Sequence, residues 1–132
     1  MSITVSGKGK TFHLSNNEIS YIMTVLPNSQ LGQVYFGKKI RERDDYSSFL
    51  EYRARPMASC VFDTDKNFSM EHIRQEYGVF GATDYRMPAA EVVKENGSRI
   101  SEFTYSDYRI ESGKPKLPGL PATYTEEDSE AE

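Results

Sequence analysis

Apolar and polar residues alternate along several parts of the chain, with the period of two that is typical of β-strands. The pattern predicts strands over residues 11–14, 19–26, 34–36, 58–62, 89–95 and 98–110. In the second of these segments one face is shared by Ile19, Tyr21, Met23 and Val25. Turn signals separate the strands, and Asn96-Gly97 is the strongest of them because this dipeptide favours a tight hairpin. The pattern therefore predicts a mostly β, antiparallel fold, and we expect a β-sandwich with one short helix.

The segments between these strands have other compositions. Residues 1–10 are small, polar and rich in Gly and Lys, so we expect a flexible N-terminus. Residues 37–56 are predicted as a long surface loop, and seven of the eight residues 38–45 are charged. The short helix is predicted from Met70 to about Glu76, because Ser69 can cap it. Residues 113–121 contain three prolines and two glycines, which favours an extended connection before an acidic end.

Length and composition limit the class of protein. A chain of 132 residues is one ordinary domain or part of a larger one, and nine Tyr and seven Phe argue against wholesale disorder. The net charge of −4 comes mainly from the acidic end, since residues 1–125 hold 16 basic and 15 acidic residues. A nucleic-acid-binding protein is therefore not expected. Apolar stretches are too short for a membrane span and the first residues lack signal-peptide character, so we expect a cytoplasmic protein.

Several short motifs resemble functional sites but lack essential residues. Gly9-Lys10-Thr11 copies the end of a phosphate-binding loop, yet Thr4 stands where a glycine is required. The run 63–67 resembles the start of a calcium loop, but Phe68 and Arg74 replace its required Gly and Glu. His13, His72 and the single cysteine, Cys60, have no partners at metal-ligand spacing, so packing or surface roles are expected for them. We therefore predict no metal site and no cofactor.

The segment Phe49-Leu50-Glu51-Tyr52-Arg53-Ala54-Arg55 mixes aromatic rings, a carboxylate and two guanidinium groups. Such a mixture suits sugar recognition, in which rings stack on the sugar and planar donors bind its hydroxyls. It also suits a structural ion-pair loop, and the composition favours that interpretation over sugar contact. Other carboxylates, such as Asp44-Asp45, have no partner pattern that indicates an acid–base pair.

A longer set of ordered motifs resembles one family. Residues 68–89 read Phe-Ser-Met-Glu-His-Ile-Arg-Gln-Glu-Tyr-Gly-Val-Phe-Gly-Ala-Thr-Asp-Tyr-Arg-Met-Pro-Ala, and Glu95-Asn96-Gly97-Ser98 follows. Further matches are Phe12-His13-Leu14, Ser20-Tyr21-Ile22-Met23, Tyr35-Phe36-Gly37-Lys38, Tyr108-Arg109-Ile110, Gly113-Lys114-Pro115-Lys116-Leu117 and Gly119-Leu120-Pro121-Ala122-Thr123-Tyr124. This set resembles the N-terminal domain of bacterial α-galactosidases of glycoside hydrolase family 36. One departure is Gly78, where relatives commonly have Pro.

The resemblance implies a fold and an enzyme context. It implies that residues 11–124 are the first part of an N-terminal β-sandwich, and that residues 125–132 lead into a further strand. The catalytic aspartates of the family lie in a (β/α)8 barrel beyond this chain, so we expect no catalysis by the chain alone. The whole enzyme is expected to be a homo-oligomer that hydrolyses terminal α-galactosides such as melibiose and raffinose.

The resemblance also implies candidate substrate contacts. In some oligomeric relatives an early loop of this domain reaches the pocket of a neighbouring subunit, and the corresponding residues here are Glu51, Arg53 and Arg55. The alternative function is a free-standing carbohydrate-binding module, against which stands the absence of Trp. As a truncated sandwich the isolated chain is expected to be marginally stable, because strand edges and an inner face lack cover.

Overall fold

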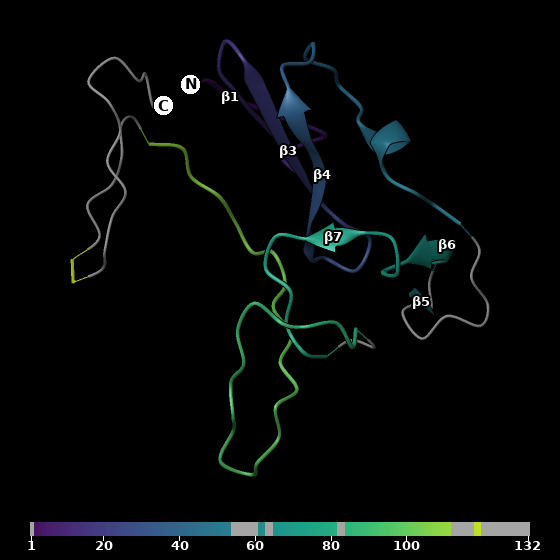
Figure 1. The fold of residues 1–132 in the computed structure, drawn as a ribbon, viewed down its shortest axis with the longest axis vertical. Helices are drawn as coiled ribbons and strands as arrows, with labels where there is room; N and C mark the ends of the chain where they lie inside the picture. Colours follow the sequence, from purple (N-terminus) through teal and green to yellow (C-terminus); the bar gives the residue numbers. More distant parts are fainter. Residues whose placement is uncertain (1, 54–60, 63–64, 82–83, 112–117, 120–132) are drawn as a thin grey trace.

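The computed structural model describes residues 2–53, 61–62, 65–81, 84–111 and 118–119. Five strands form an antiparallel sheet in the order β1-β2-β3-β4-β7 (Figure 1). These strands are β1 (Ser2–Ser6), β2 (Thr11–Ser15), β3 (Ile19–Val25), β4 (Leu31–Lys38) and β7 (Arg74–Gln75). A second sheet pairs β5 (Val61–Phe62) with β6 (Asp65–Ser69). The prediction of a mostly β, antiparallel fold is confirmed.

Local turn chemistry connects the first four strands into a meander. Gly7, Lys8 and Gly9 all have positive φ angles in the β1–β2 turn, a conformation that glycine adopts without steric cost. Residues Ser2–Ser6, which lie in the expected flexible N-terminus, form the edge strand β1. A β-bulge between Ile22 and Met23 shifts the register of β3 against β4. The extra residue increases the local twist of the sheet.

Both faces of the sheet carry side chains that pack. Ile22 lies opposite His13 on β2 and Tyr35 on β4, so these three side chains share one face. The other face carries Phe12, whose ring meets those of Tyr105 and Tyr108 at centroid distances of 6.2 and 4.9 Å. The predicted alternation in 19–25 is present, but the fully buried positions are Ser20 and Ile22 rather than the predicted apolar set. Ile19 is 42% exposed, and Tyr21, Met23 and Val25 are half-buried.

The main apolar cluster lies where the β3–β4 hairpin meets the segment after β6. It consists of Leu26, Phe68, Met70 and Ile73, and Leu50 packs against it. The Tyr52 ring lies 6.4 Å from the Phe68 ring, between centroids. The cluster therefore holds together three parts of the chain that are far apart in sequence.

The prediction of a helix from Met70 to about Glu76 is wrong. Ser69 Oγ does accept the amide of Glu71 at 3.2 Å, as a capping residue would, and Ile73 N bonds Met70 O at 3.3 Å. After this single turn the chain becomes β7, because Arg74 and Gln75 pair with Gln33 and Gly32 of β4. The only helical element among the described residues is a 3-10 turn at Ser47–Phe49.

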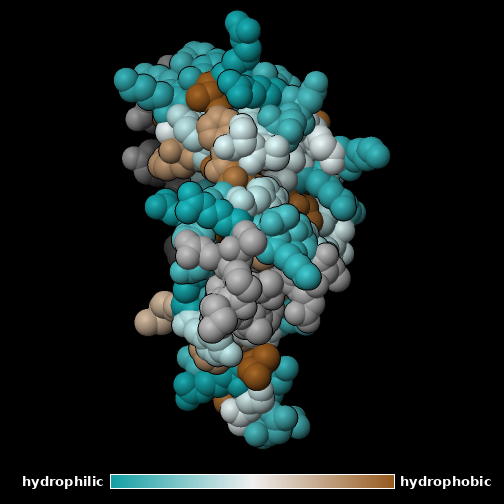
Figure 2. All heavy atoms as spheres, turned by 90° about the vertical axis from the view of Figure 1, so that its right-hand side faces the viewer, coloured by the Kyte–Doolittle hydropathy of each residue, from teal (hydrophilic) through white to brown (hydrophobic). Residues whose placement is uncertain are grey.

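The predicted hairpin over 89–110 is half right. The Asn96-Gly97 turn forms, with Lys94 N bonded to Ser98 O at 2.9 Å and Gly97 at φ 79°. The two limbs form no ladder, and Figure 1 shows them as a long excursion away from the sheet. Val92, Val93 and Ile100 on this excursion are 48%, 62% and 58% exposed. Figure 2 shows hydrophobic surface next to hydrophilic surface on one face of the molecule. An isolated strand pair is marginal in water, so the limbs do not pair on the turn signal alone.

Parts of other predicted elements lie outside the described residues, namely residues 58–60 of the predicted strand 58–62, most of the connection 113–121, and the acidic end. In the part of the chain that the structure describes, no helix has the length and apolar character needed to cross a bilayer.

We expect Phe68→Ala to lower the free energy of unfolding by about 3–5 kcal/mol, because a large buried side chain leaves a cavity in the apolar cluster. Urea unfolding of the 132-residue chain, followed by circular dichroism, measures the change. Phe36→Ala is the matched control, since Phe36 is 66% exposed and its removal should cost about 0.5 kcal/mol or less. Equal losses from the two variants would contradict the assignment of Phe68 to the core.

Candidate functional site

A surface hollow of about 410 Å³ lies beside β4 and the segment that follows it. We call it the Glu51 hollow. Its lining includes Tyr35 and Phe36 of β4, Phe49 and Glu51 of the following segment, and His72 and Arg74 before and in β7. The Phe49 ring packs edge-on against Tyr35 at 5.6 Å, which fixes one aromatic wall. The hollow therefore combines apolar ring surface with a carboxylate, an imidazole and a guanidinium.

Two of the three predicted substrate contacts lie at this hollow or next to it. Glu51 lines the hollow, and its Oε1 bonds Nε of Arg53 at 2.9 Å. Oε2 of Glu51 lies 3.9 Å from His72 Nδ1. The side chains of Glu51 and Arg53 are 43% and 66% exposed, so both can exchange this ion pair for another partner. Arg55 lies outside the described residues.

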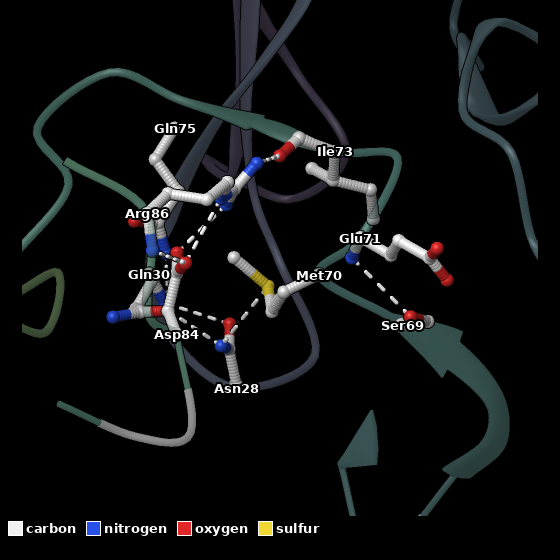
Figure 3. A network of polar contacts seen from close by, with 9 residues as sticks. All are labelled: Asn28, Gln30, Ser69, Met70, Glu71, Ile73, Gln75, Asp84 and Arg86. Carbon is white, nitrogen blue, oxygen red and sulfur yellow. Dashed lines mark hydrogen bonds and ion pairs between the residues drawn. The ribbon is translucent and has the colours of Figure 1, made fainter. Parts of the chain in front are cut away.

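A cluster of polar contacts lies on the other side of β7, and we call it the Arg86 cluster. Arg86 donates from Nε and Nη2 to the two carboxylate oxygens of Asp84, at 2.9 and 2.7 Å. Nη1 donates to the carbonyl of Ile73 at 2.6 Å (Figure 3). Asp84 is buried, and the hydrogen bonds from Arg86 hold the pKa of its carboxyl below its usual range. The hydrogen bond from Arg86 therefore connects Ile73, the residue before β7, to the loop that follows β7.

A group of amides extends the Arg86 cluster toward the β3–β4 turn. Gln30 Oε1 accepts from Asn28 Nδ2 at 2.6 Å and from Gln75 Nε2. Asn28 Nδ2 also contacts the sulfur of Met70 at 3.5 Å, as Figure 3 shows. The oxygen Oε1 of Gln75 is buried and lacks a partner among the described residues. The turn after β3 is thereby tied to β7 through side chains rather than through the ladder alone.

The Glu76 carboxylate has a structural partner as well. It accepts the hydroxyl of Tyr21 on β3, and both of its oxygens lie within reach. Burial and the bond to Glu76 raise the pKa of Tyr21, so the phenol keeps its proton and acts as the donor. The polar residues of the run 68–89 thus build contacts between strands and loops.

The two hollows near β7 are neighbours. A second hollow, of about 390 Å³, lies beside Asp84, Arg86 and Pro88. Gln33 and Arg74, a cross-strand pair of β4 and β7, line both this hollow and the Glu51 hollow. The Arg86 cluster therefore borders the second hollow, and Gln33 and Arg74 lie between that hollow and the Glu51 hollow.

The motifs that lacked essential residues have other roles. Gly9-Lys10-Thr11 belongs to the β1–β2 turn and to the start of strand β2, where a phosphate-binding loop would lead into a helix. Asp65 begins β6, while Asp63 and Cys60 lie outside the described residues. Among the residues that the structure describes, no group of three or more His, Cys, Asp or Glu side chains could hold a metal ion.

Sequence reasoning missed one buried polar group. His13, Ser20 and Tyr46 come from three separate elements and are bonded to one another beneath the charged loop. His13 was expected in a packing or surface role, which its burial fits, but its partners were not foreseen. The alternation along β2 and β3 places His13 and Ser20 on one face, which is the only local signal for the pair.

These observations define a class of protein. The chain is an antiparallel β domain in which residues of the run 68–89 connect loops to the sheet and border a surface hollow with aromatic walls. Residues 29–132 match the family model described as the glycosyl hydrolase family 36 N-terminal domain. The α-galactosidase AgaA of Geobacillus stearothermophilus is 39% identical over 132 residues, which cover all of this chain and 18% of AgaA. The chain therefore belongs to glycosyl hydrolase family 36, within its N-terminal domain.

Solved structures agree with this assignment. The α-galactosidase from Lactobacillus brevis has a TM-score of 0.82 and 33% identity, over 97% of this chain and 17% of that one. A variant of AgaA in complex with raffinose has a TM-score of 0.74 and 39% identity, over 89% of this chain and 16% of that one. The predicted family and its β-sandwich fold are confirmed. The chain spans less than a fifth of the length of these relatives.

We expect Arg86→Lys to destabilise the chain, because one ammonium group cannot bond both Asp84 oxygens and the Ile73 carbonyl at once. The expected loss in the free energy of unfolding is about 2 kcal/mol, in the range for hydrogen bonds to charged groups. The matched control is Arg99→Lys, since Arg99 pairs with Glu91 at 2.7 Å but is 64% exposed. Urea midpoints that fall equally in both variants would contradict a special role of Arg86.

Acid should weaken the fold through Asp84. Its pKa is lowered in the folded state, so the unfolded chain binds the proton more readily, and stability falls as pH drops through the folded pKa. Urea midpoints measured from about pH 5 to about pH 3 should fall less steeply in Asp84→Asn than in the wild-type chain. Asp107→Asn, at an exposed position, serves as the control for removing one charge. Parallel acid curves for Asp84→Asn and wild type would argue against this linkage.

Proposed function

We propose that this chain is the N-terminal, non-catalytic part of an α-galactosidase that hydrolyses terminal α-galactosides of the raffinose and melibiose type. The observation that carries the proposal is the match over the whole chain to α-galactosidases, always within less than a fifth of their length. AgaA shares 39% of its residues with this chain in the matched segment, and variants of AgaA have been solved with raffinose and with stachyose. The roles proposed for the chain are structural support, subunit assembly and contact with sugar at the rim of the pocket.

The Glu51 hollow is the part of the chain that fits contact with sugar. The Phe36 ring is 66% exposed and offers a face on which the C–H groups of a pyranose can stack. The Phe49 ring, which has Arg43 over it at 5.9 Å, forms another part of the lining. Glu51 and Arg53 supply an acceptor and several donors for sugar hydroxyls. The Glu51–Arg53 pair is exposed, and exposed ion pairs contribute little to stability, so a ligand can displace it at low cost. We therefore propose Glu51, Arg53 and Arg55 as substrate-proximal residues that do not take part in bond cleavage.

The whole enzyme is proposed to be a cytoplasmic homo-oligomer in which this rim completes the pocket of a neighbouring subunit. Such a rim binds the ground state and the transition state equally, because it lies away from the bond that breaks. Removing a contact of this kind raises KM and leaves kcat unchanged. This split distinguishes a rim residue from a catalytic one.

We expect Glu51→Gln and Arg53→Lys, made in the complete enzyme, to raise KM for raffinose about fivefold while kcat stays within about twofold. The matched control is Glu111→Gln, because Glu111 forms an ion pair with Arg109 of the same 2.9 Å length at an exposed position. The control should keep the wild-type KM. Unchanged KM in both Glu51 and Arg53 variants would remove these residues from the rim.

The isolated 132-residue chain, purified without the rest of the enzyme, tests the alternative of a free-standing carbohydrate-binding module. Titration of the 132-residue chain with raffinose should give no saturable change in tyrosine fluorescence, because the proposed pocket needs the rest of the enzyme. A saturable change that Glu51→Gln abolishes would favour the binding module instead.

A further inference from the structure

A buried polar group lies under the charged segment 39–50, and we call it the loop anchor. It consists of His13 on β2, Ser20 on β3 and Tyr46, just before the 3-10 turn. His13 Nε2 lies 2.9 Å from Ser20 Oγ, and His13 Nδ1 lies 2.9 Å from the Tyr46 hydroxyl. All three residues are at most 5% exposed.

The backbone of the charged segment bonds to two of these three side chains. Ile40 N donates to Ser20 Oγ at 3.0 Å, and Arg43 N donates to the Tyr46 hydroxyl at 2.9 Å. His13 and Ser20 belong to the sheet and Tyr46 belongs to the segment, so these hydrogen bonds tie the segment to the sheet. The seven charged side chains of residues 38–45 can therefore remain in water while hydrogen bonds to Ser20 and Tyr46 fix the backbone.

The neutral His13 ring has one nitrogen that donates and one that accepts. The hydroxyls of Ser20 and Tyr46 each accept a backbone amide and each carry one proton, so both ring nitrogens are satisfied in either tautomer. Burial lowers the pKa of His13, with Glu42 acting against this shift and Lys39 with it. A serine beside a histidine resembles a nucleophile and its base, but Ser20 is 0% exposed, so no substrate can reach it.

The anchor continues into the Glu51 hollow through two further contacts. The Tyr46 ring lies 6.2 Å from the Phe49 ring, which forms an aromatic wall of the hollow. Leu50 packs against the apolar cluster of Leu26, Phe68, Met70 and Ile73. Glu51 follows directly, so the residue proposed to meet sugar comes immediately after a fixed part of the chain.

We propose that His13, Ser20 and Tyr46 are positioning residues that hold the segment 39–53 in the geometry needed for sugar contact. The inference rests on the proposed function, because it assigns to buried residues the placement of the rim that Glu51 and Arg53 form. None of the three touches the sugar. Their effect passes through the backbone of Ile40 and Arg43 and through the Phe49 ring.

The test uses the complete enzyme with Tyr46→Phe and His13→Leu. Each variant removes a bond of the loop anchor while keeping most of the side-chain volume. KM for raffinose should rise about fivefold, the factor for one lost hydrogen bond, and kcat should stay within about twofold. Hydrogen exchange at the amide of Arg43 should quicken in Tyr46→Phe, because that amide loses its acceptor.

Two further variants show whether the effect belongs to the anchor. Tyr105→Phe removes a hydroxyl 3.5 Å from the Gly9 carbonyl, away from the segment, and should keep the wild-type KM. His13→Asn keeps a hydrogen-bonding group near the position of Nδ1 but carries no titratable proton, so its KM should lie closer to wild type than that of His13→Leu. Its KM should also change less than the wild-type KM on acidification, because protonation of His13, whose pKa is lowered by burial, turns both ring nitrogens into donors.

Each outcome decides the proposal. Unchanged KM in Tyr46→Phe and His13→Leu, or a lower thermal midpoint with unchanged KM, would overturn it and leave the anchor a purely structural contact. If Glu51→Gln raises KM and the anchor variants do not, the positioning role fails while the proposed function stands. If the anchor variants raise KM and Glu51→Gln does not, the segment is positioned for another of its groups, and the assignment of Glu51 fails instead.

Discussion

The packing of Leu26, Phe68, Met70 and Ile73 is the contact on which the rest of the structure depends. It joins the turn after β3 to the end of β6 and to the residue before β7, and it places Leu50 beside them. At about 1.5–3 kcal/mol for each fully buried side chain of this size, the four residues together stabilise the fold by roughly 6–12 kcal/mol. Most residues of the long loops do not contact this cluster, so other interactions must fix the positions of the loops.

Charged and polar side chains supply those means where the loops leave the cluster. Arg86 bonds a buried carboxylate and the carbonyl of Ile73, so the loop after β7 is fixed to a residue of the apolar cluster itself. A buried carboxylate without Arg86 would be an uncompensated charge, which costs more than the pair contributes. The Arg86 cluster and the apolar cluster therefore depend on each other, because each keeps the other in the geometry it requires.

The sequence predicts those parts of the fold that local interactions decide. The strands β2, β3 and β4 follow from alternation and turn residues, since neighbouring strands of a meander pair through short connections. The helix predicted over 70–76 fails for a non-local reason: Met70 and Ile73 are both buried in the cluster, and Arg74 and Gln75 then pair with β4. The mixture of a carboxylate and two guanidinium groups in residues 49–55 made an ion-pair loop one of the two interpretations, and Glu51 does pair with Arg53. The bond between His13 and Tyr46 joins residues 33 positions apart, and no local pattern indicates it.

The segment 39–50 shows how a highly charged loop can have one conformation. Its start is held where the amide of Ile40 meets Ser20, its middle where Tyr46 meets His13, and its end where Leu50 enters the apolar cluster. Between these points the charges stay in water, so the loop is not required to bury any of them. Three fixed points on a twelve-residue segment leave little backbone freedom to lose when a ligand binds at its end. If Glu51 and Arg53 meet sugar as proposed, the affinity there would be limited by ordering of these two side chains rather than by ordering of the loop, which is the benefit of preorganisation.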